Sequence, residues 1–461
     1  MYKKIISSLF IVNFAYSGSM GHHVDFPLFS IIPFIGILLS IAIVPLINHD
    51  FWHKHYGKVS FFWGALFFIP LLIIDTSFAF EELILVTFTE YLPFIIILLA
   101  LFTIAGGIEI KGSLVGTPQL NTALILLGTI LASWMGTTGA SMLLIRPLIR
   151  ANKFRSSNVH IIIFFILLVA NVGGALTPLG DPPLFLGFLN GIDFFWPTTH
   201  LFIPMLIHVI FLLSLFFLLD NYFYKREINI DENNKENTTI QIKGKINFLL
   251  MLGVVLAVLI SGMYDLGSFH ISSIEIKIQN ILRDLILLSL ALISWKATDM
   301  ELRKSNGFTW FPILEVSKLF AGIFITIIPA ISILKMGLDG PLYKIVELTA
   351  NLDGSQNPFM YFWLTGILSG FLDNAPTYLV FFNTAGGDAY ALMNNFPQTL
   401  LAISSGAVFF GALTYIGNAP NFMVKSIAEE NGIKMPSFFG YIGWTTIILI
   451  PIFAVYSILF F

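Results

Sequence analysis

Apolar runs alternate with short polar segments along nearly the whole chain, and most runs are about 20 residues long, enough for a helix to cross a bilayer core. The strands of a membrane barrel would instead alternate apolar and polar positions over about ten residues. The pattern therefore predicts an all-α polytopic membrane protein. Five spans are expected in each half of the chain, at about 26–47, 59–80, 88–106, 158–190, 199–220, and then 246–264, 284–299, 311–334, 398–427 and 437–460.

Each half also contains a pair of half-length apolar segments, around 121–149 and 358–385. Neither member of a pair is long enough to cross alone, so each pair predicts a re-entrant hairpin. The polar stretch at 221–245 predicts a cytoplasmic linker. We therefore divide the chain into a first inverted repeat at 21–220 and a second at 246–461.

The first 20 residues place Lys3 and Lys4 before a short apolar stretch that ends in small residues. This is the layout of a secretory signal peptide. We expect residues 1–20 to be a cleaved signal, which places the mature N-terminus on the outer side, or else an uncleaved extra helix.

Lysine and arginine are concentrated in the loops of one side, as expected for the cytoplasmic side of a membrane. The few basic residues expected on the outer side are Lys277, Arg283, Lys335 and Lys344. With five spans in each half, the second half must have the opposite orientation, so the first hairpin enters from inside and the second from outside.

The two halves also share residues. The stretch GALTPLGDPPLFLG begins at Gly174 and GALTYIGNAPNFMV begins at Gly411, 237 positions later. The two hairpin regions, LASWMGTTGASMLL from Leu131 and LSGFLDNAPTYLVF from Leu368, have the same offset. Inverted repeats with paired interruptions indicate a secondary transporter that binds its substrate between the repeats.

Four helix breaks follow from this pattern, two at hairpin tips and two at the Gly/Pro interruptions. Broken helices expose carbonyls that can bind a small cation and N-termini that can bind an anion. The short oxygen-bearing side chains at the breaks suit a hard ion such as sodium. The candidate binding residues are Thr137, Thr138, Gly180, Asp181, Asp373, Asn374 and Asn418.

Asp373 and Asp181 can each be neutralised by a proton or a cation, and competition between the two ions is the simplest mechanism for exchange. We expect Asp373 to be the principal proton carrier and Asp181 to be a second carrier or a cation ligand. Alternatively, either aspartate only caps the half-helix that follows it.

The stretches TTGASMLLIRPL, NVGGALTPLGDPP, SGFLDNAPT and YIGNAPNFMV resemble the ion transporter superfamily, which includes dicarboxylate and citrate carriers, arsenite pump subunits and NhaD-type sodium/proton antiporters. The resemblance covers nearly the whole chain after the signal segment and is closest to the bacterial antiporter or citrate-transporter-like branch. It implies a bacterial inner-membrane protein with two inverted repeats, and a homodimer that works by elevator motion.

In the carboxylate carriers of this superfamily, Ser-Asn-Thr triplets at the hairpin tips bind sodium and the substrate. The matching triplets here are Gly136-Thr137-Thr138 and Asp373-Asn374-Ala375. The resemblance places Gly180 and Asn418 at the unwound segments, and implies sodium binding at Thr137, Gly180, Asp181, Asn374 and Asn418. An acid and no arginine at the tips favour cation exchange over transport of a dianion.

A sodium/proton antiporter is therefore the first functional hypothesis, and a sodium- or proton-coupled symporter of citrate or another organic anion is the alternative. No cofactor is expected beyond the coupling ion. The net charge of −3, without a basic cluster, argues against nucleic acid as a partner. Hydrolase and ATPase motifs are absent from the sequence, and the residues around Asp181 and Asp373 depart from those of intramembrane aspartyl proteases. A channel is disfavoured by the inverted repeat.

Overall fold

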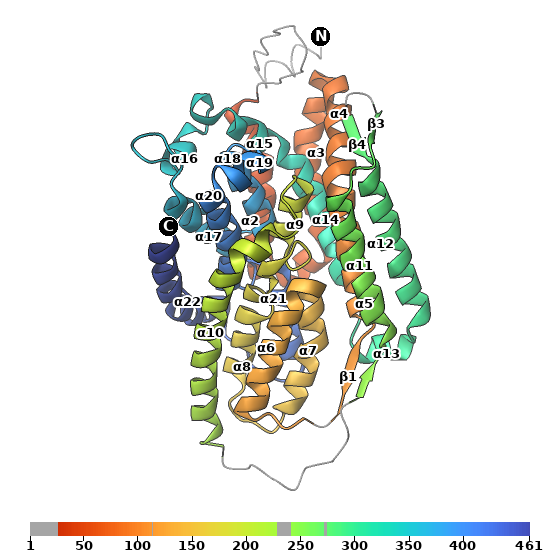
Figure 1. Cartoon of the computed structure of the whole chain (residues 1–461), viewed down its shortest axis with the longest axis vertical. Helices are drawn as coiled ribbons and strands as arrows, with labels where there is room; N and C mark the ends of the chain where they lie inside the picture. Colours follow the sequence, from red (N-terminus) through yellow and green to blue (C-terminus); the bar gives the residue numbers. More distant parts are fainter. Residues whose placement is uncertain (1–25, 113, 228–240, 272–273) are drawn as a thin grey trace.

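The computed structural model describes residues 26–112, 114–227, 241–271 and 274–461, apart from the side chains of His49 and Ile271. The expected signal peptide at 1–20 and part of the expected linker at 221–245 lie outside these residues. The described chain is predominantly helical, which confirms the predicted all-α polytopic class (Figure 1). Two short antiparallel pairs of strands add to the helices: β1 (Glu109–Lys111) with β2 (Gln241–Lys243), and β3 (Ser268–Ile271) with β4 (Ile274–Lys277).

The first half begins with two long helices, followed by a third span that contains a π-helical turn, Thr87–Tyr91 (η2). A hairpin, a broken span and a long last helix complete it. The helices are α2 (Ile32–Ile47), α3 (His49–Ile74), α4 (Thr76–Val86), α5 (Leu92–Ala105), α6 (Pro118–Met135), α7 (Thr137–Ala151), α8 (Val159–Leu168), α9 (Pro182–Leu189) and α10 (Trp196–Tyr224).

The second half repeats this order, with short helices added at the loops. Its helices are α11 (Ile246–Met263), α12 (Ile278–Ala297), α13 (Met300–Ser305), α14 (Phe311–Thr326), α15 (Ile328–Lys335), α16 (Tyr343–Leu348), α17 (Pro358–Phe371), α18 (Asn374–Thr384), α19 (Ala389–Asn394), α20 (Pro397–Phe410), α21 (Ala419–Glu430) and α22 (Phe438–Phe460).

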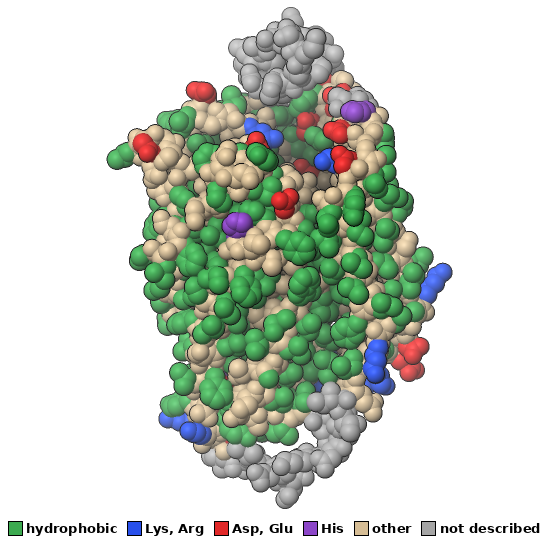
Figure 2. Space-filling view, viewed as in Figure 1, with side chains coloured by type: hydrophobic (Ala, Val, Ile, Leu, Met, Phe, Trp, Pro, Cys, Tyr) green, Lys and Arg blue, Asp and Glu red, His purple; other side chains and the backbone are tan. Residues whose placement is uncertain are grey.

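Eight helical segments of the described chain are long and apolar enough to cross a membrane, and the bent pair α14 and α15 makes a ninth. The tenth predicted span is the interrupted one built from α20 and α21. Large apolar side chains cover much of the outer surface, as lipid contact requires (Figure 2).

Two spans differ clearly from the expectation, and the third span of the chain runs from Thr76 to Ala105 instead of 88–106. The second span is His49–Ile74 instead of 59–80, because Asn48 and Asp75 accept hydrogen bonds from the first turns of α3 and α4 and so fix both ends. The polar residues after Asn48 are therefore helical instead of lying in a loop.

The packing of the two halves is reciprocal. Helix α5 of the first half packs on α12 of the second, and α14 of the second half packs on α3 of the first. In each half the two arms of the hairpin pack together, and the second arm also packs against the broken span of the other half. Equivalent elements thus make equivalent contacts, as expected for two structural repeats.

The two hairpins open toward opposite ends of the molecule. The base of α6 and α7 lies near β1, where Arg150 donates a hydrogen bond to the Ile110 carbonyl. The base of α17 and α18 lies at the other end, where Gln356 donates to the Ala385 carbonyl. Figure 1 shows α7 reaching down toward β1 and α18 near α15 and α19 at the top.

The base of the first hairpin is joined to α8 and α10 by a buried polar cluster, which we call the Asp220 cluster: Asn121, Asn152, Arg155, His160 and Asp220. Asp220 Oδ1 accepts a hydrogen bond from Arg155 at 2.6 Å and lies 2.8 Å from His160 Nε2. Its Oδ2 accepts a hydrogen bond from Asn121 at 3.0 Å. The side chains of Arg155 and Asp220 are fully buried, so this ion pair has no contact with water.

Just outside the Asp220 cluster, Glu227 receives hydrogen bonds from Ser156 and from the backbone of Ser157. Partial burial raises the pKa of Glu227, but these hydrogen bonds outweigh burial and lower the pKa below its usual value. Glu227 therefore stays ionised at neutral pH and ties the chain after α10 to the loop after α7.

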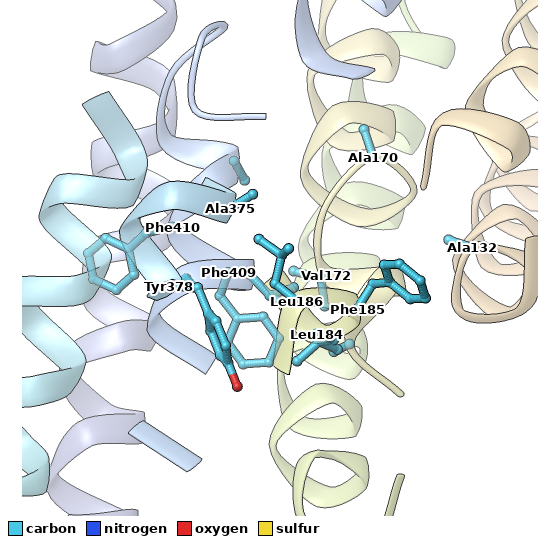
Figure 3. Packing of buried hydrophobic residues seen from close by; sticks show 14 of the residues in the cluster. Ala132, Ala170, Val172, Leu184, Phe185, Leu186, Ala375, Tyr378, Phe409 and Phe410 are labelled. Atoms are coloured by element: carbon cyan, nitrogen blue, oxygen red, sulfur yellow. The ribbon is translucent and has the colours of Figure 1, made fainter. Parts of the chain in front are cut away.

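The short helix α9 passes through the centre of the protein. Leu184, Phe185 and Leu186 pack among Ala375 and Tyr378 of α18 and Phe409 of α20 (Figure 3). This contact holds the broken span of the first half against the hairpin of the second.

Candidate functional site

Equivalent hydrogen bonds, one in each half, hold the two broken spans open. Thr177 donates from its hydroxyl to the Ser133 carbonyl in the first half, and Thr414 donates to the Gly370 carbonyl at 2.6 Å in the second. Each threonine hydroxyl thus donates to a backbone carbonyl near a hairpin tip, where the end of the helix leaves the carbonyl without an intrahelical partner. The predicted breaks are therefore present at the equivalent positions of both halves.

Gly180 brings the first break against the first hairpin tip. Its carbonyl accepts a hydrogen bond from the Thr137 backbone N–H at 2.9 Å. A Cβ atom at Gly180 would lie 2.1 Å from the Gly174 carbonyl oxygen, a distance that excludes any side chain. Gly136, at the hairpin tip, has a φ of 80°, which favours glycine.

The carboxylate of Asp181 lies where both hairpin tips and both broken spans meet. Its Oδ1 accepts hydrogen bonds from Thr137 Oγ1 at 3.1 Å and from Asn418 Nδ2 at 2.9 Å. Its Oδ2 accepts one from Asn374 Nδ2 at 2.6 Å. All four side chains are almost completely buried, with at most 2% of their surface exposed. The structure thus brings together four residues that the sequence placed at four separate breaks.

Four helices begin at this point: α7, α9, α18 and α21. The N-terminus of a helix carries partial positive charge, so their convergence favours a negative group between them. The Asp181 carboxylate is such a group. Although Asp181 precedes α9, its side chain makes no capping hydrogen bond to that helix.

Asp373 has different surroundings. Its carboxylate accepts a hydrogen bond from the Ala375 backbone N–H at 3.0 Å and so caps α18. It is partly exposed and acts on Asp181 electrostatically. Thr138 is also half-buried and lies on the wall of the neighbouring cleft. Asp373 thus caps a helix, whereas Asp181 lies at the point where the hairpin tips and the broken spans meet.

Two asparagines that the sequence analysis did not select support the site. Asn171 donates to Asn421 Oδ1 at 2.7 Å, and Asn421 donates to the carbonyls of Gly411 and Thr414. Asn418 also donates to Asn171 Oδ1 at 3.3 Å. Single asparagines inside the apolar runs that flank the breaks were the signal that could have found these residues.

One oxygen in the site lacks a hydrogen-bond donor among the described residues. This oxygen is Asn374 Oδ1, which is buried, while the amide nitrogen of the same side chain is bound to Asp181. An unsatisfied buried oxygen beside a carboxylate is the kind of donor atom that a sodium ion accepts.

A cleft of about 90 Å³ opens beside this cluster, between the first hairpin tip and the helices α5 and α14. Thr137, Thr138 and Asp181 supply the polar side chains of its wall, and Phe94, Leu98 and Ile313 are among its apolar residues. No basic side chain is found among the described residues that line the cleft.

Replacing Gly180 with alanine is expected to destabilise the protein by about 1–3 kcal/mol, because the added methyl group must displace the Gly174 backbone. The melting temperature of the purified variant would measure this loss. Gly443→Ala is the matched control, since Gly443 is exposed on α22 and has open space around it. Equal melting temperatures for both variants would contradict the close approach of the two segments.

The model of the family described as "Putative citrate transport" matches residues 23–461. A search of curated proteins gave no match. The family match includes both hairpins and both broken spans around Asp181. The chain therefore belongs to this citrate-transport family, and it is a multi-pass membrane transporter.

Proposed function

We propose that the protein is a secondary transporter that exchanges sodium for protons at Asp181. The observation that carries this proposal is the convergence of both hairpin tips and both broken spans on one buried carboxylate. A carboxylate can bind either a proton or a sodium ion, and each expels the other. The loaded site is then close to neutral, which lowers the cost of moving it within the membrane.

The remaining oxygens of the site fit this cargo. Asn374 Oδ1, at the second hairpin tip, is available for sodium, and Thr137 Oγ1 and the Gly180 carbonyl lie at the first tip. When a proton replaces sodium, it neutralises the Asp181 carboxylate as sodium did, so the two loaded states of the site carry the same charge. Asp373, close enough to act on Asp181, supplies a second negative charge that attracts either cation.

A second candidate is a symporter of citrate or another organic anion. The description of the family and the four helix N-termini around the site favour it. In this case sodium or a proton on Asp181 would have to screen the carboxylate from the anionic substrate, because the described cleft offers no basic side chain.

The lysine- and arginine-rich loops support an orientation with the base of the first hairpin in the cytoplasm. We place the protein in the bacterial inner membrane, in line with the sequence resemblance, and regard the homodimer as part of the same proposal.

The test is transport by purified protein in liposomes, with sodium, lithium, potassium and citrate compared side by side. We expect an imposed pH gradient to collapse on addition of sodium without any organic acid. Two results together would overturn exchange in favour of symport: citrate uptake that requires sodium, and no sodium-driven proton movement when citrate is left out.

A further inference from the structure

Glu90 is a carboxylate in the third span that the site described above does not use. It lies in the π-helical turn between α4 and α5 (η2), about halfway along a helical segment that runs from Thr76 to Ala105. An ionisable residue inside a membrane span is costly, and π-helical turns often occur at functional sites. Both features call for a role.

The helix directs Glu90 toward the cleft. Residues four apart lie on one ridge of a helix, and Glu90 is followed on its ridge by Phe94, Leu98 and Phe102, all of which line the cleft beside Asp181. Glu90 therefore lies about one helical turn before Phe94, beyond the outer end of the cleft wall. The turn that carries it also packs against α9, the helix that begins directly after Asp181.

Two charged groups influence Glu90. Glu82 on α4 adds negative charge, and Lys335 at the end of α15 adds positive charge. Within the described residues, neither Lys335 nor any other side chain forms a hydrogen bond or a close ion pair with the Glu90 carboxylate. A fixed structural ion pair therefore does not account for this acid. Acidic and basic side chains surround a hollow at the top of the molecule (Figure 2).

We propose that Glu90 is a second cation-binding residue, which receives the transported cation from the outer side before it reaches Asp181. The inference rests on the proposed exchange function and extends it to the outer route. Glu82 strengthens the attraction of Glu90 for a cation, and Lys335 weakens it, so that the ion binds Glu90 loosely enough to leave it.

The test measures sodium-driven proton movement in vesicles of known orientation, with sodium varied on the outer side. Glu90→Gln is expected to raise the half-saturating sodium concentration about tenfold, the effect of losing one charge near the route. Glu90→Asp, which keeps the charge, is expected to recover most of this shift. Glu81→Gln is the matched control, since Glu81 lies beside Glu82 on α4 but is not one of the two charged groups that influence Glu90.

Lys335→Gln separates a direct role of Glu90 from a general effect of charge. It is expected to lower the half-saturating sodium concentration when Glu90 is present and to change it little when Glu90 is already glutamine. A Glu90→Gln variant that matches wild type or Glu81→Gln would overturn the inference while leaving exchange at Asp181 intact. Absence of any sodium-driven proton movement in the unsubstituted protein would overturn the exchange function, and this inference with it.

Discussion

Substitution of Asp181 by asparagine is expected to reduce transport at least about a hundredfold, which corresponds to about 2.7 kcal/mol. The substitution keeps the size of the side chain and removes its charge. The new amide offers one acceptor oxygen where the carboxylate has two, so it cannot accept the hydrogen bonds of Thr137, Asn374 and Asn418 at the atoms that Asp181 uses. The site would also have no carboxylate on which a proton and sodium could compete. Transport in liposomes, normalised to the amount of folded protein, measures the loss.

Asp373→Asn is the matched comparison for this result. Asparagine is as good a helix cap as aspartate, so the cap on α18 should survive. We expect a loss of less than about tenfold, from the weaker attraction of the site for cations. If Asp373→Asn were inactive and Asp181→Asn retained its activity, Asp373 would be the principal proton carrier, as the sequence alone suggested.

The largest effect on stability is expected from Asp220→Ala. This change would leave the buried guanidinium of Arg155 without its counter-charge, at a cost of about 3–5 kcal/mol. It would also loosen the base of the first hairpin, where Asn121 and His160 share the same carboxylate. A fall in the melting temperature of the detergent-purified protein is the expected result.

Two further variants make the Asp220 result specific. Asp353→Ala removes an exposed carboxylate whose hydrogen bonds, among the described residues, go only to Ser355 of its own loop, and the melting temperature should match that of wild type. The double variant Arg155→Leu with Asp220→Leu should lose less stability than Asp220→Ala, because no buried charge is left unpaired. A double variant as unstable as the single one would mean that packing, not charge, dominates this cluster.

Much of the architecture could be predicted from the sequence. The offset of 237 residues located both breaks, because Gly and Pro cannot continue a membrane helix unless their surroundings compensate, and the structure has a break at Thr177 and at Thr414. The end of the second span could not be found from hydropathy. That end depends on a hydrogen bond from Phe78 N to Asp75, and polarity averaged over a window does not detect a capping side chain.

The candidate site was only partly predictable. Residue types and spacing predicted Asp181, Asn374 and Asn418 as site residues. They did not predict which of the two aspartates lies where the hairpin tips meet and which one caps a helix. Asp181 and Asp373 both precede a half-helix, so both sequences look like caps. Which carboxylate turns away from its helix is decided by the three-dimensional packing of Thr137 and Asn374 against it. The supporting pair Asn171 and Asn421 was missed, although single asparagines stand out in the apolar runs that flank the breaks.

The hydrogen bond between Asn418 and Asp181 joins two positions that are equivalent in the two halves. At 2.9 Å, two aspartates there would repel each other unless they shared a proton, and two asparagines would carry no charge at all. Similarity between the halves must therefore stop at this pair. The first half provides the charged Asp181 and the second half provides Asn418, which donates a hydrogen bond to it. Neither half can therefore form the site without the other.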